Sequence, residues 1–150
     1  MAWRHTLKAI KEKLQLINNN YMGMYTQIHF ASELKKDTPE IVLDVLSYMA
    51  GNTKNKPNKL PTHKLFTTSR WGGLMTMSSY YFDYKTQADF YLDSIAGGYY
   101  LSFTSNLKNY GSEIENFIDW IDPYLMKSKG EFLGYSRYEE TEEPTLIYKK

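Results

Sequence analysis

Two stretches of this chain repeat one plan, a strand followed by a helix, and they limit the fold more than any other feature. In the longer stretch, residues 99–107 alternate between apolar and more polar side chains, which is typical of a strand with one covered face. Residues 114–125 then place their apolar side chains three and four positions apart, which predicts an amphipathic helix. Residues 27–49 follow the same plan. Helices that cover one face of a sheet make an α+β domain.

A shift of 73 residues aligns the two stretches, placing Phe30 on Phe103 and Glu40 on Glu113. Strand-like patterns follow each unit, at 74–84 and 87–93 after the first and at 131–139 and 145–148 after the second. The sequence therefore predicts an N-terminal helix followed by a duplicated β-α-β-β unit, with an antiparallel sheet and helices on one face. We expect a helical appendage at 1–20 and one α+β domain at 24–150, with pseudo-repeats at about 24–94 and 98–149.

Helix boundaries are marked by cap residues. Thr38 before Pro39 predicts an N-cap with proline in the first turn. The tetrad from Ser112 to Glu115 has the S-x-x-E pattern of a capping box. Gly51 is a suitable stop for the helix before it.

The composition excludes several classes of protein. The 150 residues contain no cysteine, so disulfides, thiolate catalysis and cysteine-ligated metals are ruled out. No apolar run approaches the roughly 20 residues that cross a bilayer, and residues 1–23 lack the apolar core of a secretory signal. We expect the protein to be cytoplasmic in its host cell, with no membrane partner.

The net charge of +1 hides an uneven distribution. Residues 1–70 carry 11 Lys and Arg against 5 Asp and Glu, whereas residues 71–150 carry 7 against 12. Such a field could steer a charged partner, although ordinary solvated faces would give the same counts.

The N-terminal helix carries a narrow apolar seam with a spacing of 4, 3, 4 and 3 residues. Such a seam can dock on a second copy of the chain, making a homodimer, or on the sheet of its own domain. The seam consists of Trp3, Leu7, Ile10, Leu14 and Ile17.

No catalytic, metal or nucleotide motif stands out. The histidines His5, His29 and His63 have no metal-ligand spacing, and His29 is most simply a sheet side chain with a hydrogen-bond partner. No serine lies in a G-x-S-x-G motif, and the glycine pairs lack the context of a phosphate loop. We therefore expect no enzyme activity, no catalytic residue, no cofactor and no metal.

Two charged segments are candidate contact surfaces. The first is a basic loop with an aromatic residue, which suits single-stranded nucleic acid, a solvated loop or a protein contact; it comprises Lys54, Lys56, Lys59, Lys64, Arg70 and Trp71. The second is an acidic hairpin whose carboxylates we expect to be solvated and able to engage a basic protein surface; it comprises Tyr135, Arg137, Tyr138, Glu139, Glu140, Glu142 and Glu143.

Three phrases in the chain are similar to a family of small proteins from phages, prophages and integrative elements. They are SSYYF, LKNYGSEIE with DWI and PYL, and GYSRYEE with EEPTLIY, and the resemblance covers about residues 24–148. It implies a mobile-element context, in which small proteins often inhibit host defence, as anti-CRISPR proteins do. It supplies no catalytic residues.

Together these observations predict a non-enzymatic binding protein that acts by protein–protein contact. The expected partner is a host protein, such as a defence nuclease or its complex. The alternative is a nucleic-acid-binding accessory protein that uses the basic loop at 54–71.

Overall fold

The computed structural model describes residues 2–17, 24–82 and 84–150, with the side chains of the first helix described from residue 4 to residue 11. Its longer elements, in chain order, are α1 (Ala2–Ile17), β1 (Thr26–Glu33), α2 (Glu40–Met49), β2 (Gln87–Asp93), β3 (Gly98–Leu107), α3 (Glu113–Ile121), β4 (Phe132–Tyr138) and β5 (Thr145–Tyr148). Three short 3₁₀ helices connect them, η1 (Lys64–Thr67), η2 (Trp71–Gly73) and η3 (Asp122–Tyr124).

The described strands form one antiparallel sheet of five strands in the order β2-β3-β1-β4-β5. The α+β class predicted from the sequence is therefore confirmed. Because β3 lies between β1 and β2, the path β1-α2-β2 is a split strand–helix–strand unit, and β3-α3-β4 makes a second one. This order is the plan of ferredoxin-like domains, here extended at one edge by β5.

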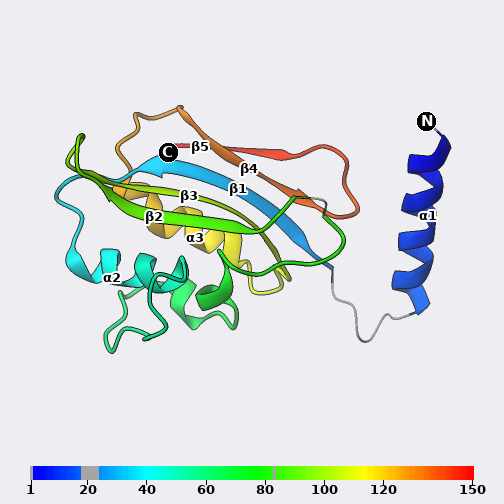
Figure 1. Cartoon of the computed structure of the whole chain (residues 1–150), viewed down its shortest axis with the longest axis horizontal. Helices are drawn as coiled ribbons and strands as arrows, with labels where there is room; N and C mark the ends of the chain where they lie inside the picture. Colours follow the sequence, from blue (N-terminus) through cyan, green and yellow to red (C-terminus); the bar gives the residue numbers. More distant parts are fainter. Residues whose placement is uncertain (1, 18–23, 83) are drawn as a thin grey trace.

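Helices α2 and α3 lie along the same face of the sheet (Figure 1). Alternate residues of β1 and β3, including Ile28, Phe30 and Phe103, point toward them and are buried. Phe117 of α3 meets Phe30 at a ring-centroid distance of 5.4 Å and Phe103 at 5.5 Å. Each such buried side chain stabilises the fold by about 1.5–3 kcal/mol relative to an exposed one. This interface fixes the sheet and leaves its second face for other contacts.

The predicted strand at 74–84 is wrong, because Leu74 to Tyr84 forms turns and bends in its described residues. Leu74 and Met75 are both fully buried, whereas neighbouring residues of a strand point to opposite faces. The Leu74 carbonyl accepts a hydrogen bond from the Ser105 hydroxyl, which ties this segment to β3. The first unit therefore has one strand after its helix, and duplication stays a prediction. Phe30 and Phe103, which the 73-residue shift aligns, face each other in the β1–β3 ladder.

Thr38 is not the N-cap of α2, and Ser112 is the N-cap residue of α3 but does not form the predicted capping box. The Thr38 hydroxyl donates to the Lys35 carbonyl, and α2 begins with Pro39 at its cap position. Ser112 adopts a left-handed conformation, with φ of 55°, and makes no side-chain cap bond. The Asn109 side chain instead accepts from the backbone N–H of Ile114 at 2.9 Å. A side chain from the preceding turn thus performs the task that the capping box predicted for Ser112.

Helix α1 stands beside the end of the sheet at which β4 turns into β5 (Figure 1). The Lys8 ammonium lies 3.4 Å from a Glu142 carboxylate oxygen in that turn. The Lys11 ammonium donates to the Tyr81 carbonyl at 3.1 Å and lies over the Tyr81 ring. No helix among the described residues is both long and apolar enough to cross a membrane.

Candidate functional site

A groove lies between α1 and the sheet face that points away from α2 and α3, with a volume of about 950 Å³. We call it the sheet-face groove. The domain contributes Gln27, Tyr81, Tyr84, Tyr135, Arg137, Glu142 and Pro144 to its lining. Helix α1 contributes Arg4, Leu7, Lys8 and Lys11. The groove therefore brings together residues that the sequence assigned to the helical seam and to the acidic hairpin.

The floor of the groove is polar and buried. Gln27 is only 1% exposed, and neither its amide nitrogen nor its carbonyl oxygen has a hydrogen-bond partner among the described residues. On the same face of the sheet, His29 Nε2 and Asn106 Oδ1 are likewise buried and unpartnered within the described part of the chain. A buried polar group without a partner costs about 1–3 kcal/mol, so such a floor favours a bound polar group or water.

Aromatic rings surround His29 in this region. The Tyr135 ring lies 4.5 Å from the His29 ring, and the Tyr84 ring meets it edge-on at 5.3 Å. His29 Nδ1 and the Thr104 hydroxyl form a hydrogen bond of 2.8 Å, which confirms the expectation of a sheet histidine with a partner. The guanidinium of Arg137 lies 5.1 Å from the Phe82 ring centre. These ring contacts hold the groove walls in place.

The titratable groups of the groove favour their neutral forms. Burial, and secondarily the positive charge of Arg137, lowers the pKa of His29 below its ordinary value. Burial, and secondarily the nearby Tyr84 hydroxyl, raises the pKa of Tyr135. Near neutral pH the Tyr135 phenol in the groove lining is therefore protonated and the His29 imidazole behind it is uncharged, and neither group supplies a strong base.

The β4–β5 turn divides the predicted acidic residues into two groups. Glu139 is 4% exposed, and its carboxylate accepts from the Tyr25 backbone N–H at 3.0 Å. The expectation that its carboxylate is solvated is therefore wrong, because the strand end folds over it. Glu140, Glu142 and Glu143 are exposed.

Exposed tyrosines lie beside the exposed carboxylates of the turn. Tyr138 is 36% exposed and Tyr110 is 62% exposed. Burial, followed by the carboxylates of Glu140 and Glu139 and by Tyr110, raises the pKa of the Tyr138 phenol. We call Tyr110, Tyr138, the adjacent Glu140 and Glu143, an exposed carboxylate of the same turn, the acidic tyrosine patch. It combines negative charge with the Tyr138 phenol, whose raised pKa keeps its hydroxyl a donor at neutral pH.

The predicted basic loop presents lysines but not its tryptophan. Lys54, Lys56, Lys59 and Lys64 are exposed, whereas Trp71 is 6% exposed and packs against Phe66 and Tyr48. Its ring has no free face on which a base could stack. Arg70 lies 3.8 Å from the buried carboxylate of Glu113 and over the Tyr110 ring. Both residues therefore serve the fold.

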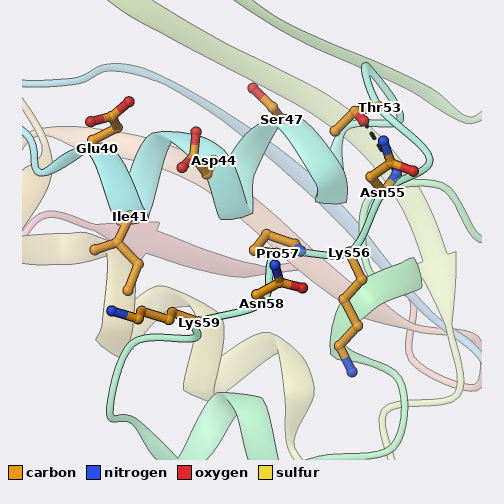
Figure 2. A pocket seen from close by; sticks show the side chains of 10 residues that line it. All are labelled: Glu40, Ile41, Asp44, Ser47, Thr53, Asn55, Lys56, Pro57, Asn58 and Lys59. Atoms are coloured by element: carbon orange, nitrogen blue, oxygen red, sulfur yellow. Dashed lines mark hydrogen bonds between the residues drawn. The ribbon is translucent and has the colours of Figure 1, made fainter.

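A smaller pocket of about 440 Å³ lies between α2 and the loop at 53–59 (Figure 2). Its lining mixes Lys56 and Lys59 with the carboxylates of Glu40 and Asp44 on α2. Those carboxylates oppose phosphate binding, because they cancel the positive potential of the lysines. The pocket therefore adds no support to nucleic-acid binding by this loop.

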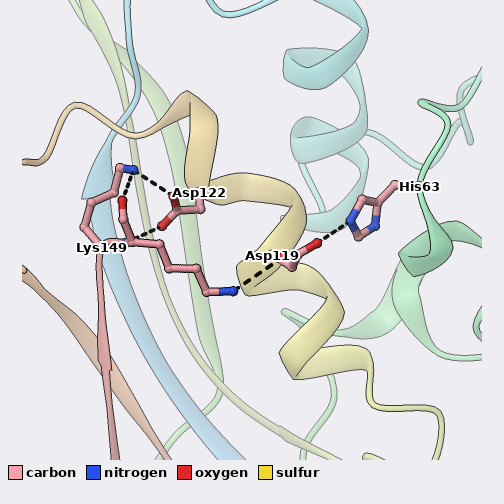
Figure 3. A network of polar contacts seen from close by, with 5 residues as sticks. His63, Asp119, Asp122 and Lys149 are labelled. Carbon is pink, nitrogen blue, oxygen red and sulfur yellow. Dashed lines mark hydrogen bonds and ion pairs between the residues drawn. The ribbon is translucent and has the colours of Figure 1, made fainter. Parts of the chain in front are cut away.

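A polar network joins His63 to α3 and to the end of the chain (Figure 3). His63 Nε2 lies 2.9 Å from the Asp119 carboxylate, and its Nδ1 accepts from the Leu65 backbone N–H at 3.0 Å. The hydrogen bond from His63, and then that from Lys150, lowers the pKa of Asp119. Both ring nitrogens of His63 are occupied, so this His–Asp pair anchors the loop and offers no free base.

Asp122, the first residue of η3 directly after α3, binds the last residues of the chain. Lys149 donates to the Asp122 carboxylate at 2.7 Å, with both side chains largely buried, and the Lys150 backbone N–H donates to the same carboxylate at 3.0 Å. The network in Figure 3 is thus a structural clamp between β5, α3 and η1.

The apolar seam of α1 is described only at Leu7 and Ile10, which are 47% and 48% exposed. The side chains of Trp3, Leu14 and Ile17 lie outside the described residues. Self-association through this seam stays a prediction.

The described residues contain no group of three or more His, Asp or Glu side chains placed to hold a metal ion. No protein-family model, curated protein or solved structure matches the chain. The resemblance to mobile-element proteins therefore stays a prediction, and function has to be inferred from the two surfaces described above.

Sequence reasoning missed Gln27, Tyr81 and Tyr84 as residues of a site. The alternation of β1 does place Gln27 beside His29 on one face, which is a weak signal for a polar floor. Nothing in the sequence indicates that Gln27 is buried, or that Tyr81, Tyr84 and residues of α1 line the groove beside it.

Proposed function

We propose that this chain is a non-enzymatic binding protein that covers a basic surface of another protein. The observation that carries the proposal is the acidic tyrosine patch, where the exposed phenols of Tyr110 and Tyr138 lie beside exposed carboxylates at one end of the sheet. Tyrosine offers contact area and a hydroxyl at a small entropic cost, and complementary charge increases the rate of association.

The charges of the patch are available to a partner. Glu140 and Glu143 make no ion pair with any residue that the structure describes, whereas Glu142 pairs with Lys8. Each exposed carboxylate adds little to the stability of the fold, so its removal should change binding without changing folding. The resemblance adds the context of a phage or mobile element, in which the partner would be a host protein such as a defence nuclease.

The test compares three forms of the tagged protein in pull-downs from a bacterial lysate, analysed by quantitative mass spectrometry. Glu140→Gln/Glu143→Gln removes two exposed charges from the patch. Asp37→Asn/Asp44→Asn removes two exposed charges near α2 and is the matched control. We expect a protein that the wild type and the control capture and the patch variant loses, with the same melting temperature for all three.

The interaction should also weaken as salt is raised, because exposed charges are screened. Equal capture by the patch variant and the wild type would show that the patch does not bind the partner. Recovery of nucleic acid in place of protein would reject the proposal and favour the alternative function.

A further inference from the structure

We propose that the sheet-face groove binds an adenine nucleotide, with the base on Gln27 and the phosphate on the basic residues at the rim. This inference goes beyond protein binding and uses a different face of the molecule from the acidic tyrosine patch. It rests on an unpartnered amide, on flanking aromatic rings and on a cluster of cations.

The buried amide of Gln27 supplies the recognition group. A carboxamide presents a donor and an acceptor side by side, which matches the N6 donor and the N7 acceptor of adenine. Gln27 lines the groove, is 1% exposed and leaves both of these atoms unpartnered among the described residues. Guanine presents two acceptors on the same edge, so the carboxamide discriminates against it.

Aromatic side chains beside Gln27 provide surfaces for a planar base. Tyr84 and Tyr135 both line the groove, and both rings contact His29 from different directions. Stacking on such rings favours any base, so the rings add affinity while the amide adds selectivity. The groove volume of about 950 Å³ is large enough for a nucleotide.

The rim of the groove supplies positive charge for a phosphate. Arg137 stacks on Phe82 and makes no ion pair within the described part of the chain. Lys8 and Lys11 approach from α1, and the carboxylate of Glu142 accounts for only one of these charges. An arginine whose plane is already held by a ring loses little freedom when its N–H groups bind a phosphate.

A free nucleotide and an adenine-containing single strand share this chemistry. We would therefore measure binding to the full chain by titration calorimetry and by thermal shift. The ligands are AMP, ATP, adenosine, GMP and two single-stranded DNA oligonucleotides of ten nucleotides, one of deoxyadenylate and one of deoxythymidylate. The variants are Gln27→Met and Arg137→Gln. Lys129→Gln is the matched control, because it removes one exposed charge outside the groove and outside the basic loop.

We expect adenine ligands with a phosphate to bind more tightly than adenosine and GMP. Gln27→Met should weaken this binding about ten-fold or more, which is the usual effect of losing a bidentate base contact. It should leave the melting temperature of the free protein unchanged or higher, because it replaces an unpartnered buried amide with an apolar side chain. Arg137→Gln should weaken phosphate-bearing ligands much more than adenosine, and Lys129→Gln should bind as the wild type does.

Binding of AMP or ATP with no preference for the deoxyadenylate strand would identify a free nucleotide as the source. Much tighter binding of the strand would identify single-stranded nucleic acid. The absence of binding by every adenine ligand at about 1 mM, the weak end of specific affinity, would overturn the proposal. Unchanged affinity in both Gln27→Met and Arg137→Gln would also overturn it, because binding would then occur elsewhere.

Two further variants keep the test decisive. If Gln27→Met does not fold, Lys8→Gln/Lys11→Gln removes groove charges from α1 and should lower the affinity for AMP, and unchanged affinity would count against the proposal. Glu140→Gln/Glu143→Gln should still bind AMP. Failure of the groove is therefore distinguishable from failure of the acidic tyrosine patch.

Discussion

Replacement of Glu139 by alanine should destabilise the fold, although the sequence assigns this residue to a solvated contact surface. Its side chain is 4% exposed, and its carboxylate accepts from the Tyr25 N–H at 3.0 Å at the start of β1. Alanine would leave that N–H without its acceptor. The backbone pairing between Glu139 and Tyr25 would survive, since it does not depend on the side chain.

The magnitude follows from the type of bond. A hydrogen bond to a charged group contributes about 1.5–3 kcal/mol, so we expect a loss of about 2 kcal/mol in the free energy of unfolding. For a domain of this size, that loss lowers the melting temperature by roughly 4–8 °C. Glu139→Gln keeps an oxygen acceptor and should lose about half as much.

Scanning calorimetry and urea denaturation would measure the difference. Glu140→Ala is the matched control, because it removes the same charge from the exposed neighbouring position and should change stability by less than about 0.5 kcal/mol. Equal stability of Glu139→Ala and Glu140→Ala would refute the reasoning that burial and the Tyr25 contact separate these two carboxylates. The difference between Glu139 and Glu140 also matters for tests of function. In a variant that removes both carboxylates, a folding defect could not be told apart from the loss of a binding contact.

Two further predictions concern the sheet around the groove. Gly134 lies at the bulge of β4, where an added Cβ would fall 1.8 Å from the His29 carbonyl oxygen, so Gly134→Ala should cost at least about 3 kcal/mol or prevent folding. Gly130→Ala is the control, because nothing lies within 4 Å of an added Cβ, and it should cost only the backbone strain of about 1 kcal/mol. Similar urea midpoints for the two variants would contradict the steric explanation. The second prediction is that stability falls on acidification from pH 7.5 to 5.5, because the lowered pKa of His29 lets the unfolded chain take up a proton first. The contribution of His29 to stability is fully present above its unfolded pKa of about 6.5 and is lost as the pH falls toward the folded pKa. Urea melts of His29→Gln should therefore show a smaller loss of stability between pH 7.5 and 5.5 than those of the wild type. An equal loss in both proteins would count against this assignment.

The sequence by itself determined the fold class and most of the elements. Period-two alternation predicted the strands that the structure has as β1 and β3, and apolar spacing predicted α2 and α3, because both signals depend on nearby residues alone. The buried ring cluster around Phe117 follows from these two patterns, since the apolar face of a sheet and that of a helix must cover each other.

Contacts between distant segments decided the remaining features. Leu74 to Tyr84 has a strand-like composition, but burial of two neighbouring side chains and the bond from Ser105 fold it into turns. Thr38 does not cap α2 because its hydroxyl donates to the Lys35 carbonyl, and at α3 the Asn109 side chain replaces that of Ser112 by accepting from the Ile114 N–H. Local patterns cannot rank such competing hydrogen bonds.

For the candidate surfaces, too, the sequence determined which residues are close along the chain, and the tertiary structure decided which of them are buried. The sequence placed Glu139, Glu140 and Glu143 in one acidic turn, and only the tertiary structure separated the buried carboxylate from the exposed ones. The sequence likewise placed Gln27 on a polar strand face, but only the tertiary structure shows that its side chain is buried, lines the groove and has no hydrogen-bond partner among the described residues. Whether a residue is buried depends on which distant segments of the chain pack against it, and the sequence pattern around the residue does not contain that information.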